Sequence, residues 1–159
     1  GLILKMSISP NITLANFREV FRNGVLSQSR ESGIAKNYIK EFAIDTWGER
    51  QQVKNLSGGN QQKVAIARWV YANTSVFIMD EPTRGIDVGA KLEVYRIMDQ
   101  LIQDGKAIVL ISSELPEVMN LSDRVYVMHR GTIVDELSSS EFDQERIMRS
   151  ATGRGSRYE

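Results

Sequence analysis

The chain has 159 residues, of which 42% are hydrophobic and 25% are charged, which is the balance of a folded domain rather than of a disordered chain. Lys and Arg number 20, as do Asp and Glu, so no net charge directs the chain to nucleic acid or to an anionic membrane. Cysteine is absent, which excludes disulfides and thiolate metal sites, and every apolar run is far shorter than the ~18 residues that cross a bilayer.

The first third of the chain has the pattern of an interrupted helical region. Turn residues and a polar stretch separate two short segments with apolar residues at helical spacing. We therefore assign residues 1–55 to a helical subdomain. In chain order, the predicted elements are a turn at Ser9–Asn11, a helix over Leu14–Arg22, a mobile loop over Ser27–Ser32 and a helix over Ile34–Phe42.

From residue 56 onward, helical patterns alternate with short apolar runs, which is typical of α/β layers with a parallel sheet. The runs Val76–Met79 and Ala107–Ile111 are predicted to be strands buried on both faces. The remaining predicted elements are helices over Asn60–Tyr71, Val88–Gln103, Glu114–Met119 and Glu141–Arg149, and strands over Arg124–Met128 and Thr132–Asp135. We assign residues 56–150 to this α/β part and residues 151–159 to a disordered tail.

Several single residues are given structural roles only. In the helix over Val88–Gln103, we expect Leu92, Tyr95, Met98 and Ile102 to point inward. Trp47 and Trp69 are expected to be packing residues. His129, the only histidine, is expected to be solvated at a turn, and Arg84 to be a surface residue.

The string Leu56-Ser57-Gly58-Gly59-Asn60-Gln61 places two glycines directly before a predicted helix. Glycines let backbone N–H groups approach a ligand closely, and a helix N-terminus presents unpaired N–H groups that suit a phosphate. The Ser57 hydroxyl adds a further donor. The alternative is an ordinary Ser-Gly-Gly turn with Asn60 as the helix N-cap, which this string alone does not exclude.

The string Met79-Asp80-Glu81-Pro82 places two adjacent carboxylates at the end of a predicted strand. In phosphoryl-transfer sites an aspartate in this place holds Mg²⁺, and a following glutamate can orient and activate water. From these residues alone, an acidic strand-to-loop junction without chemistry is an equal alternative.

Together, the two strings resemble the ATP-binding cassette (ABC) family in their order and spacing. The first is similar to the family's signature motif and the second to its Walker B motif. The resemblance implies an α/β fold, namely a partial P-loop-type ABC ATPase core with a mostly parallel sheet flanked by helices. It implies ATP and Mg²⁺ as cofactors, with Asp80 as the Mg²⁺ ligand and Glu81 as the catalytic base. The signature residues that would contact ATP held by a partner cassette are Leu56, Ser57, Gly58, Gly59 and Gln61.

The resemblance extends from about Leu2 to Ile147, and further strings within this range indicate a particular class within the family. Thr83 to Asp87 is similar to the family's D-loop, with Asp87 as its aspartate, although Asp87 also suits the N-cap of the next helix and can serve both roles. The strings at Asn60–Lys63, Asp80–Lys91 and Ser112–Glu117 resemble the second cassette of the tandem ATPase subunits of bacterial monosaccharide importers of the ribose, galactose and xylose class.

Two features depart from the family's pattern. No Gly-x-x-x-x-Gly-Lys-Ser/Thr loop occurs, and Gly85 to Lys91 has neither its spacing nor its hydroxyl. Without that loop the chain lacks the main phosphate-binding element for a nucleotide. We therefore expect the sequence to be the C-terminal part of a cassette. Ser113 occupies the place of the switch histidine, and because a hydroxyl is shorter and has no cationic form, we expect weakened hydrolysis.

The resemblance also implies partners and a location. We expect a peripheral protein at the cytoplasmic face of the bacterial inner membrane, paired with a partner cassette and contacting a membrane permease through the helical subdomain, with no nucleic acid. One alternative is an inert docking fragment that binds no nucleotide by itself. Another is a non-transport ABC ATPase of DNA repair or translation, whose coiled coils and basic extensions are not seen here. An exposed Val- and Ile-rich strand edge predicts self-association.

Overall fold

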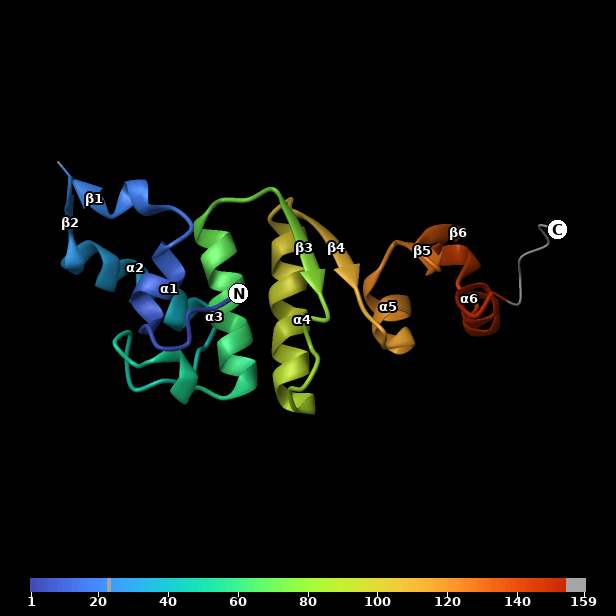
Figure 1. Ribbon diagram of the computed structural model, residues 1–159, viewed down its shortest axis with the longest axis horizontal. Coiled ribbons are helices and arrows are strands. Elements are labelled where there is room, and N and C mark those ends of the chain that lie inside the picture. The colour runs from blue at the N-terminus through green and yellow to red at the C-terminus, as the bar shows by residue number, and fades with distance from the viewer. Residues whose placement is uncertain (23, 154–159) are drawn as a thin grey trace. The chain divides into compact units, whose positions relative to one another are not determined.

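The computed structural model describes residues 1–22 and 24–153. The chain divides into two compact units, Gly1–Val109 and Leu110–Glu159 (Figure 1). Within the described residues, no helix is both long enough and apolar enough to span a membrane.

The first unit begins with a layer of helices. Its elements are α1 (Ile8–Thr13), the 3-10 turn η1 (Phe17–Glu19), the strands β1 (Phe21–Arg22) and β2 (Val25–Leu26), α2 (Gln28–Glu41), the 3-10 turn η2 (Val53–Asn55) and α3 (Gly58–Tyr71). The two short strands form an antiparallel hairpin. Helix α1 packs against both α2 and α3, and Ile8, Ile12 and Val64 are fully buried there.

The sequence prediction for residues 9–32 is wrong in three places. Ser9–Asn11 lies inside α1 rather than in a turn, because a proline in the first helical turn costs no intrahelical hydrogen bond. Leu14–Arg22 is not a helix, since it contains η1 and β1. Ser27–Ser32 is not a mobile loop but the N-cap and first turn of α2.

Tertiary hydrogen bonds explain why the polar start of α2 is ordered. The Thr13 hydroxyl donates to Glu31 Oε1 at 3.0 Å, and the Ser32 hydroxyl donates to Glu49 Oε1 at 2.9 Å. These partners lie 18 and 17 residues away in the sequence. Local composition therefore predicts a loop, whereas distant partners stabilise a helix.

A buried polar cluster joins α3 to the N-terminal segment. Arg68 Nε donates to the Asn11 carbonyl oxygen and Nη2 to Asn11 Oδ1, both at 2.6 Å, while Nη1 donates to the Gly1 carbonyl oxygen at 2.6 Å. The Asn11 amide donates in turn to the carbonyl oxygens of Ile3 and Ser7. Burial lowers the pKa of the Arg68 guanidinium, and these acceptors compensate its lost hydration.

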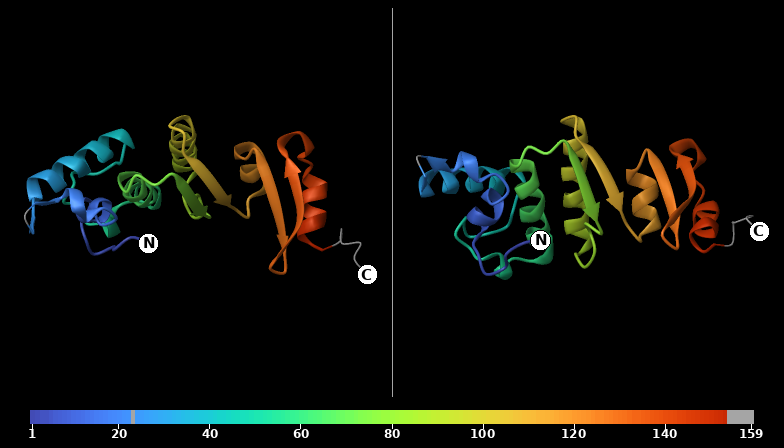
Figure 2. Two further views of the ribbon diagram at one scale, coloured as in Figure 1. Left: turned by 90° about the horizontal axis from the view of Figure 1, so that it is seen from above. Right: turned by 45° about the horizontal axis from the view of Figure 1, so that its top comes forward.

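The α/β part of the first unit consists of β3 (Val76–Asp80), α4 (Val88–Gln103) and β4 (Ala107–Ile111), which continues into the second unit. Strand β3 pairs with β4, and the Ala107 amide donates to the Ser75 carbonyl oxygen at 2.9 Å. The two strands run in the same direction in Figure 1, and α3 and α4 lie side by side in Figures 1 and 2. The predicted helix over Val88–Gln103 and both predicted strands are confirmed.

The prediction that both strands are buried on two faces is wrong for this chain. Phe77 and Met79 are buried, whereas Val76 is 57% exposed and Ile78 is 73% exposed. In β4, Val109 and Ile111 are about half exposed. A buried parallel strand needs a layer of side chains on each face, and the described residues supply that layer on one face only.

The inward face of α4 also differs from the prediction. Met98 is buried and Tyr95 half-buried, but Leu92 and Ile102 are exposed. The residues that pack inward are Val94, Ile97, Met98 and Leu101. Trp47 and Trp69, predicted to be packing residues, are both exposed. Apolar character alone does not decide which face of a helix packs inward or whether a tryptophan side chain is buried.

The second unit is a hairpin covered by helices. It contains α5 (Leu115–Leu121), β5 (Arg124–His129), β6 (Thr132–Ser138), the 3-10 turn η3 (Ser139–Glu141) and α6 (Gln144–Ala151). Both predicted strands are confirmed, and they pair antiparallel with an irregularity between Val127 and Met128. The core of this unit consists of Val125, Val127, Leu137 and Ile147, with partly buried side chains of α5 packed against it.

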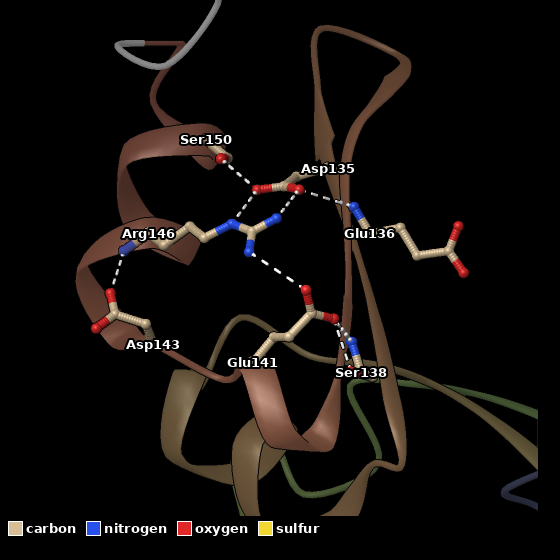
Figure 3. A network of polar contacts seen from close by, with 7 residues as sticks. All are labelled: Asp135, Glu136, Ser138, Glu141, Asp143, Arg146 and Ser150. Atoms are coloured by element: carbon tan, nitrogen blue, oxygen red, sulfur yellow. Dashed lines mark hydrogen bonds and ion pairs between the residues drawn. The ribbon is translucent and has the colours of Figure 1, made fainter.

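A polar network fastens α6 to β6 (Figure 3). Arg146 Nη2 donates to Asp135 Oδ1 at 2.7 Å and Arg146 Nε to Oδ2 at 3.0 Å, while the Ser150 hydroxyl also donates to Oδ2. The hydrogen bonds from Arg146 and then Ser150 hold the pKa of the Asp135 carboxyl below its usual value. Asp143 caps α6 by accepting from the Arg146 amide at 2.6 Å, so this helix starts after Glu141.

The C-terminal residues and the single histidine complete this unit. His129 Nδ1 lies 2.9 Å from the Ala151 carbonyl oxygen and its ring packs against Gly153, so the prediction of a solvated turn histidine is wrong. Of the predicted disordered tail, Ala151 belongs to α6 and Thr152 is its C-cap. Residues 154–159 lie outside the described residues.

Candidate functional site

The predicted signature string forms the N-terminal turn of α3. Ser57 is the N-cap, and its Oγ accepts hydrogen bonds from the Asn60 amide at 3.4 Å and from Asn60 Nδ2 at 2.9 Å. Asn60 is therefore not the N-cap that the alternative reading assumed. The Asn60 side-chain oxygen accepts a further hydrogen bond from the Asp45 amide at 2.9 Å. Asn60 thus orients the serine hydroxyl and joins it to the segment that follows α2.

This turn is suited to bind an anion. Ser57 Oγ accepts from Asn60, so its own hydroxyl proton can be donated to a ligand. Ser57 and Gly58 are exposed, and the first-turn amides of a helix point outward without intrahelical partners. Leu56 is buried and anchors the turn, while Gln61 Nε2 donates back to the Leu56 carbonyl oxygen at 3.1 Å. The five predicted signature residues therefore form one local structure.

The structure brings the signature turn together with the predicted D-loop. A Cβ atom on Gly58 would lie 3.4 Å from Ile86 Cγ2, and one on Gly59 would lie 2.5 Å from the Ala90 Cβ. Gly59 is therefore required by close helix packing, because even a methyl group would overlap with α4. Asp87 is the N-cap of α4, and its Oδ1 accepts from the Ala90 amide at 3.0 Å, so its capping role is confirmed.

The two predicted carboxylates lie at the end of β3. Asp80 is exposed, and Glu81 adopts a left-handed backbone with φ of 48°. A left-handed conformation costs energy for a residue other than glycine, and such residues cluster at functional sites. The Glu81 carbonyl oxygen accepts from the Arg84 amide at 3.2 Å, which closes the turn toward the D-loop. Within the first unit, the two carboxylates thus stand at the end of β3, and the chain after them enters the loop that contacts the signature turn.

The donor set at the end of β3 is compatible with Mg²⁺. In the part of the chain that the structure describes, no group of three or more His, Cys, Asp or Glu side chains could hold a metal. Mg²⁺ in nucleotide sites is held by one or two carboxylates together with phosphate oxygens and water, so one exposed aspartate meets this requirement. Asp80 can therefore serve a metal that arrives with a phosphate ligand.

Ser113 lies in the second unit, where it is an exposed residue between β4 and α5. The neighbouring Ser112 hydroxyl accepts from the Glu114 amide at 3.0 Å, which shapes the entry into α5. The signature turn, the D-loop and the end of β3 belong to the first unit, and Ser113 does not.

An apolar groove of about 430 Å³ runs along the exposed face of β3 and reaches Asp80. Its lining residues come from α3, β3 and the segment between them, and they include Gln62, Trp69, Ile78 and Asp80. Trp69 and Ile78, both large and apolar, line this groove and are exposed.

Sequence reasoning missed two residues that hold this region together. Lys63 follows the signature string and contacts both Glu93 and the Ala43 carbonyl oxygen. Ala90 forms the surface that receives Gly59. A lysine on the apolar side of a predicted helix is a signal in the sequence, because a buried charge needs partners. A small residue such as Ala90 gives none.

Comparisons with known proteins relate these features to a family. The sequence model of the ABC transporter family matches residues 5–84, which is half of the chain. The chain is 47% identical to a xylose import ATP-binding protein of Thermoanaerobacter pseudethanolicus over 96% of this chain and 30% of that protein. It is 46% identical to a ribose import ATP-binding protein of Bacillus subtilis over 96% of this chain and 31% of that protein. The chain thus spans about a third of the length of these relatives.

Solved structures show the same fold. A metal-chelate type ABC transporter in an inward-facing conformation superposes with a TM-score of 0.79 at 13% identity, over 96% of this chain and 60% of that chain. A dimeric ATP-binding cassette in a post-hydrolysis state, bound to ADP and phosphate, superposes with a TM-score of 0.73 at 23% identity, over 89% of this chain and 60% of that chain. The expected α/β fold of P-loop ABC ATPases is confirmed. Because the family model matches half of its length, this chain belongs to the ABC transporter family.

Proposed function

We propose that the chain is part of the ATP-binding and ATP-hydrolysing subunit of an ABC transporter that imports a sugar. In this proposal it contributes the signature motif, the Walker B motif and the D-loop to ATP sites formed between two cassettes. The observation that carries the proposal is the packing of the signature turn on the D-loop and on the start of α4, with Gly58 beside Ile86 of the D-loop and Gly59 against Ala90 of α4. Two motifs that are far apart in the sequence thereby form one surface.

Each motif has a separate role in the proposal. Ser57, Gly58 and Gly59 would bind the terminal phosphate of ATP held by the partner cassette, because their amides and hydroxyl are donors at a helix N-terminus. Asp80 would hold Mg²⁺, which supplies charge neutralisation at the phosphates. Glu81 would orient and activate the attacking water, and Asp87 would contact the partner cassette while it caps α4. Ser113 would stand in the switch position, where a hydroxyl offers a shorter reach than an imidazole.

The names of the relatives support a sugar as the transported substrate, since they are ATP-binding proteins for xylose import and ribose import. We propose that the chain acts at the cytoplasmic face of the bacterial inner membrane as a peripheral protein. Its helical region, residues 1–55, would contact a membrane permease. Within the proposal the chain represents the C-terminal part of a second cassette.

A second candidate is a docking role without nucleotide binding by the chain alone. It is favoured by one observation, namely that the sequence contains no Gly-x-x-x-x-Gly-Lys-Ser/Thr loop. Backbone amides of such a loop and its lysine provide most of the contacts to the β- and γ-phosphates. The two candidates differ in whether the chain takes part in an ATP-dependent complex.

The experiment that separates them is ATP-dependent association, measured after a calorimetric titration of the chain alone with Mg·ATP. We expect no heat of binding from the chain alone at millimolar nucleotide. The chain is then mixed with the full-length xylose import ATP-binding protein of T. pseudethanolicus, and the mass in solution is followed by light scattering. A complex that forms only with Mg·ATP supports the composite site. The absence of a complex under both conditions contradicts it.

Gly58→Asp is the informative variant for this experiment. Gly58 is exposed at the first position of α3, where an aspartate is favourable for helix stability but repels a phosphate. The variant should fold and should lose the ATP-dependent complex. Gly33→Asp, in α2 with nothing within 4 Å of an added Cβ, is the matched control and should keep it.

A further inference from the structure

Lys63 makes contacts that none of the proposed roles uses. Its Nζ donates to the Ala43 carbonyl oxygen at 2.6 Å and forms an ion pair with Glu93 Oε2 at 2.8 Å. The Lys63 side chain is 4% exposed and that of Glu93 is 48% exposed. Lys63 lies on α3, Glu93 on α4, and Ala43 follows the C-cap of α2. One cation therefore connects three segments that are 20 and 30 residues apart in the sequence.

The ion pair and the Gly59–Ala90 contact occupy successive turns of the same two helices. Lys63 comes four residues after Gly59 on α3, and Glu93 comes three residues after Ala90 on α4. Both separations keep a residue on the same helix face one turn further along. Two contacts at successive turns fix the rotation of α3 against α4, whereas the glycine contact alone would act as a pivot.

The contact with Ala43 connects this arrangement to the end of α2. Ala43 has a left-handed backbone with φ of 46°, and the next amide, that of Ile44, donates back to the Ile39 carbonyl oxygen at 2.9 Å. This is the usual way to close a helix, and the carbonyl groups at such an end attract a cation. The hydrogen bond from Lys63 to Ala43 therefore links the end of α2 directly to α3.

We propose that Lys63 is a positioning residue that fixes the first turn of α3 against α4 and transmits movement of the α2 end to Ser57, Gly58 and Gly59. It touches no nucleotide in this role. The inference rests on the proposed function, because a correctly placed signature turn is expected to strengthen the ATP-dependent complex.

The first readout is the geometry of the signature turn without nucleotide. We compare Lys63→Met, which removes both contacts, with Lys63→Arg, which keeps a cation, by amide chemical shifts of Gly58 and Gly59 and by hydrogen exchange at Gln61. The Gln61 amide donates to the Ser57 carbonyl oxygen at 2.9 Å and reports on the first turn. Lys63→Met should shift both glycine signals and speed exchange at Gln61 by about tenfold, which corresponds to ~1.4 kcal/mol. Lys63→Arg should keep the glycine signals and the exchange rate at Gln61 as they are in the unsubstituted chain.

Lys40→Met is the matched control, because Lys40 lies in the last turn of α2 and is exposed. It should leave all three amides unchanged. If Lys63→Met does not fold, Glu93→Gln removes the charge from the half-exposed side of the pair and keeps an oxygen acceptor. Native signals at Gly58, Gly59 and Gln61 in a folded Lys63→Met chain overturn the inference.

The second readout is the complex with the T. pseudethanolicus protein under Mg·ATP. Lys63→Met should weaken it by about tenfold, since small misplacements of binding groups have large effects. If the unsubstituted chain forms no complex, the proposed function fails while the amide measurements still decide the positioning of the turn. If the signature amides shift but the complex is as tight as before, the functional part of the inference is wrong.

Discussion

The signature turn and the carboxyl end of β3 carry the two motifs of the proposed site, and the chain supports them in different ways. The signature turn is held in place from behind, because Leu56 is buried, Gly59 packs against Ala90 and Lys63 is paired, while Ser57 and Gly58 stay exposed. The end of β3 is open on one side, where Ile78 and Asp80 are exposed. Contacts within the described residues therefore hold the signature turn, whereas β3 presents an apolar face without a covering layer in those residues.

The physical origin of this difference is the kind of contact that each element needs. Two helices can pack closely through a few small residues, and one such crossing is enough to orient a turn. A parallel strand that is apolar on both faces needs a layer on each side. This difference predicts large effects of substitutions on the inward side of α3 and small effects on the open face of β3.

The largest effect is expected for Arg68→Leu. The substitution removes the guanidinium that donates to the carbonyl oxygens of Gly1 and Asn11, while Asn11 Oδ1 retains the hydrogen bond from the Ile3 amide at 2.9 Å. Unfolding of the first unit should become easier by about 3 kcal/mol or more. Both tryptophans lie in this unit, so urea unfolding followed by tryptophan fluorescence measures it. Arg96→Leu, at an exposed position of α4, should change stability by less than about 0.5 kcal/mol.

Gly59→Ala should have the next largest effect. The new methyl group would meet Ala90 Cβ at 2.5 Å, and overpacking of this kind costs about 1–3 kcal/mol. Because alanine favours a helix over glycine by about 1 kcal/mol, the net loss should be roughly 0–2 kcal/mol. The double variant Gly59→Ala with Ala90→Gly should recover most of it in the same urea experiment. Additive losses in the double variant would show that the two residues do not touch.

Acid pH should act on the second unit, which contains neither the signature turn nor the carboxyl end of β3. The hydrogen bonds from Arg146 keep the pKa of Asp135 below its ordinary value of 3.8 in the folded state. The unfolded chain therefore takes up the proton first as pH falls. The stabilisation is present above about pH 4 and is lost as pH falls through the folded-state pKa.

The matching experiment follows unfolding of this unit by NMR signals of β5 and β6 between pH 7 and pH 3. Asp135→Asn should flatten the pH dependence and lower stability at neutral pH. Asp123→Asn, exposed in the same unit, should retain the dependence of the unsubstituted chain. An unchanged acid transition in Asp135→Asn would assign it to other carboxylates.

Ile78→Thr should have the smallest effect on stability. Ile78 is 73% exposed on the open face of β3, so the change in unfolding free energy should be below about 0.5 kcal/mol. Met79→Thr, on the buried face of the same strand, is the matched control and should cost clearly more. Self-association through the open face of β3, as distinct from pairing at a strand edge, should weaken in Ile78→Thr, as measured by light scattering at high protein concentration. Equal self-association in both chains would exclude this face as its cause.

The sequence predicted the elements after residue 56 better than those before it. Apolar runs such as Val76–Met79 and turn residues around them mark a strand strongly, and the amphipathic pattern of α4 is long. In the first third, α1 includes a proline and α2 begins with polar residues, so local patterns favoured turns and loops there. Hydrogen bonds from Thr13 to Glu31 and from Ser32 to Glu49 stabilise α2 instead, and no local rule contains them.

The residues of the candidate site also fall into those that local patterns predict and those that depend on distant contacts. The motif strings identified Ser57, Gly58, Gly59, Asp80 and Asp87, because glycines at a helix start and carboxylates at a strand end are signals within a few residues. Asn60 as the partner of the Ser57 hydroxyl could be suspected from its spacing. Ala90 and Glu93 could not, since their contacts come from a helix 30 residues away.

The amino-acid sequence by itself determined the kind of chemistry that the chain offers: a glycine-rich helix start, two carboxylates at a strand end and an aspartate at the next helix start. These depend on local residue types and short spacings. Only the tertiary structure decided that Gly59 meets Ala90, that Lys63 joins α2, α3 and α4, and that β3 exposes one apolar face. Such contacts depend on how whole elements pack, and side-chain identity along one segment does not specify which distant surface it meets.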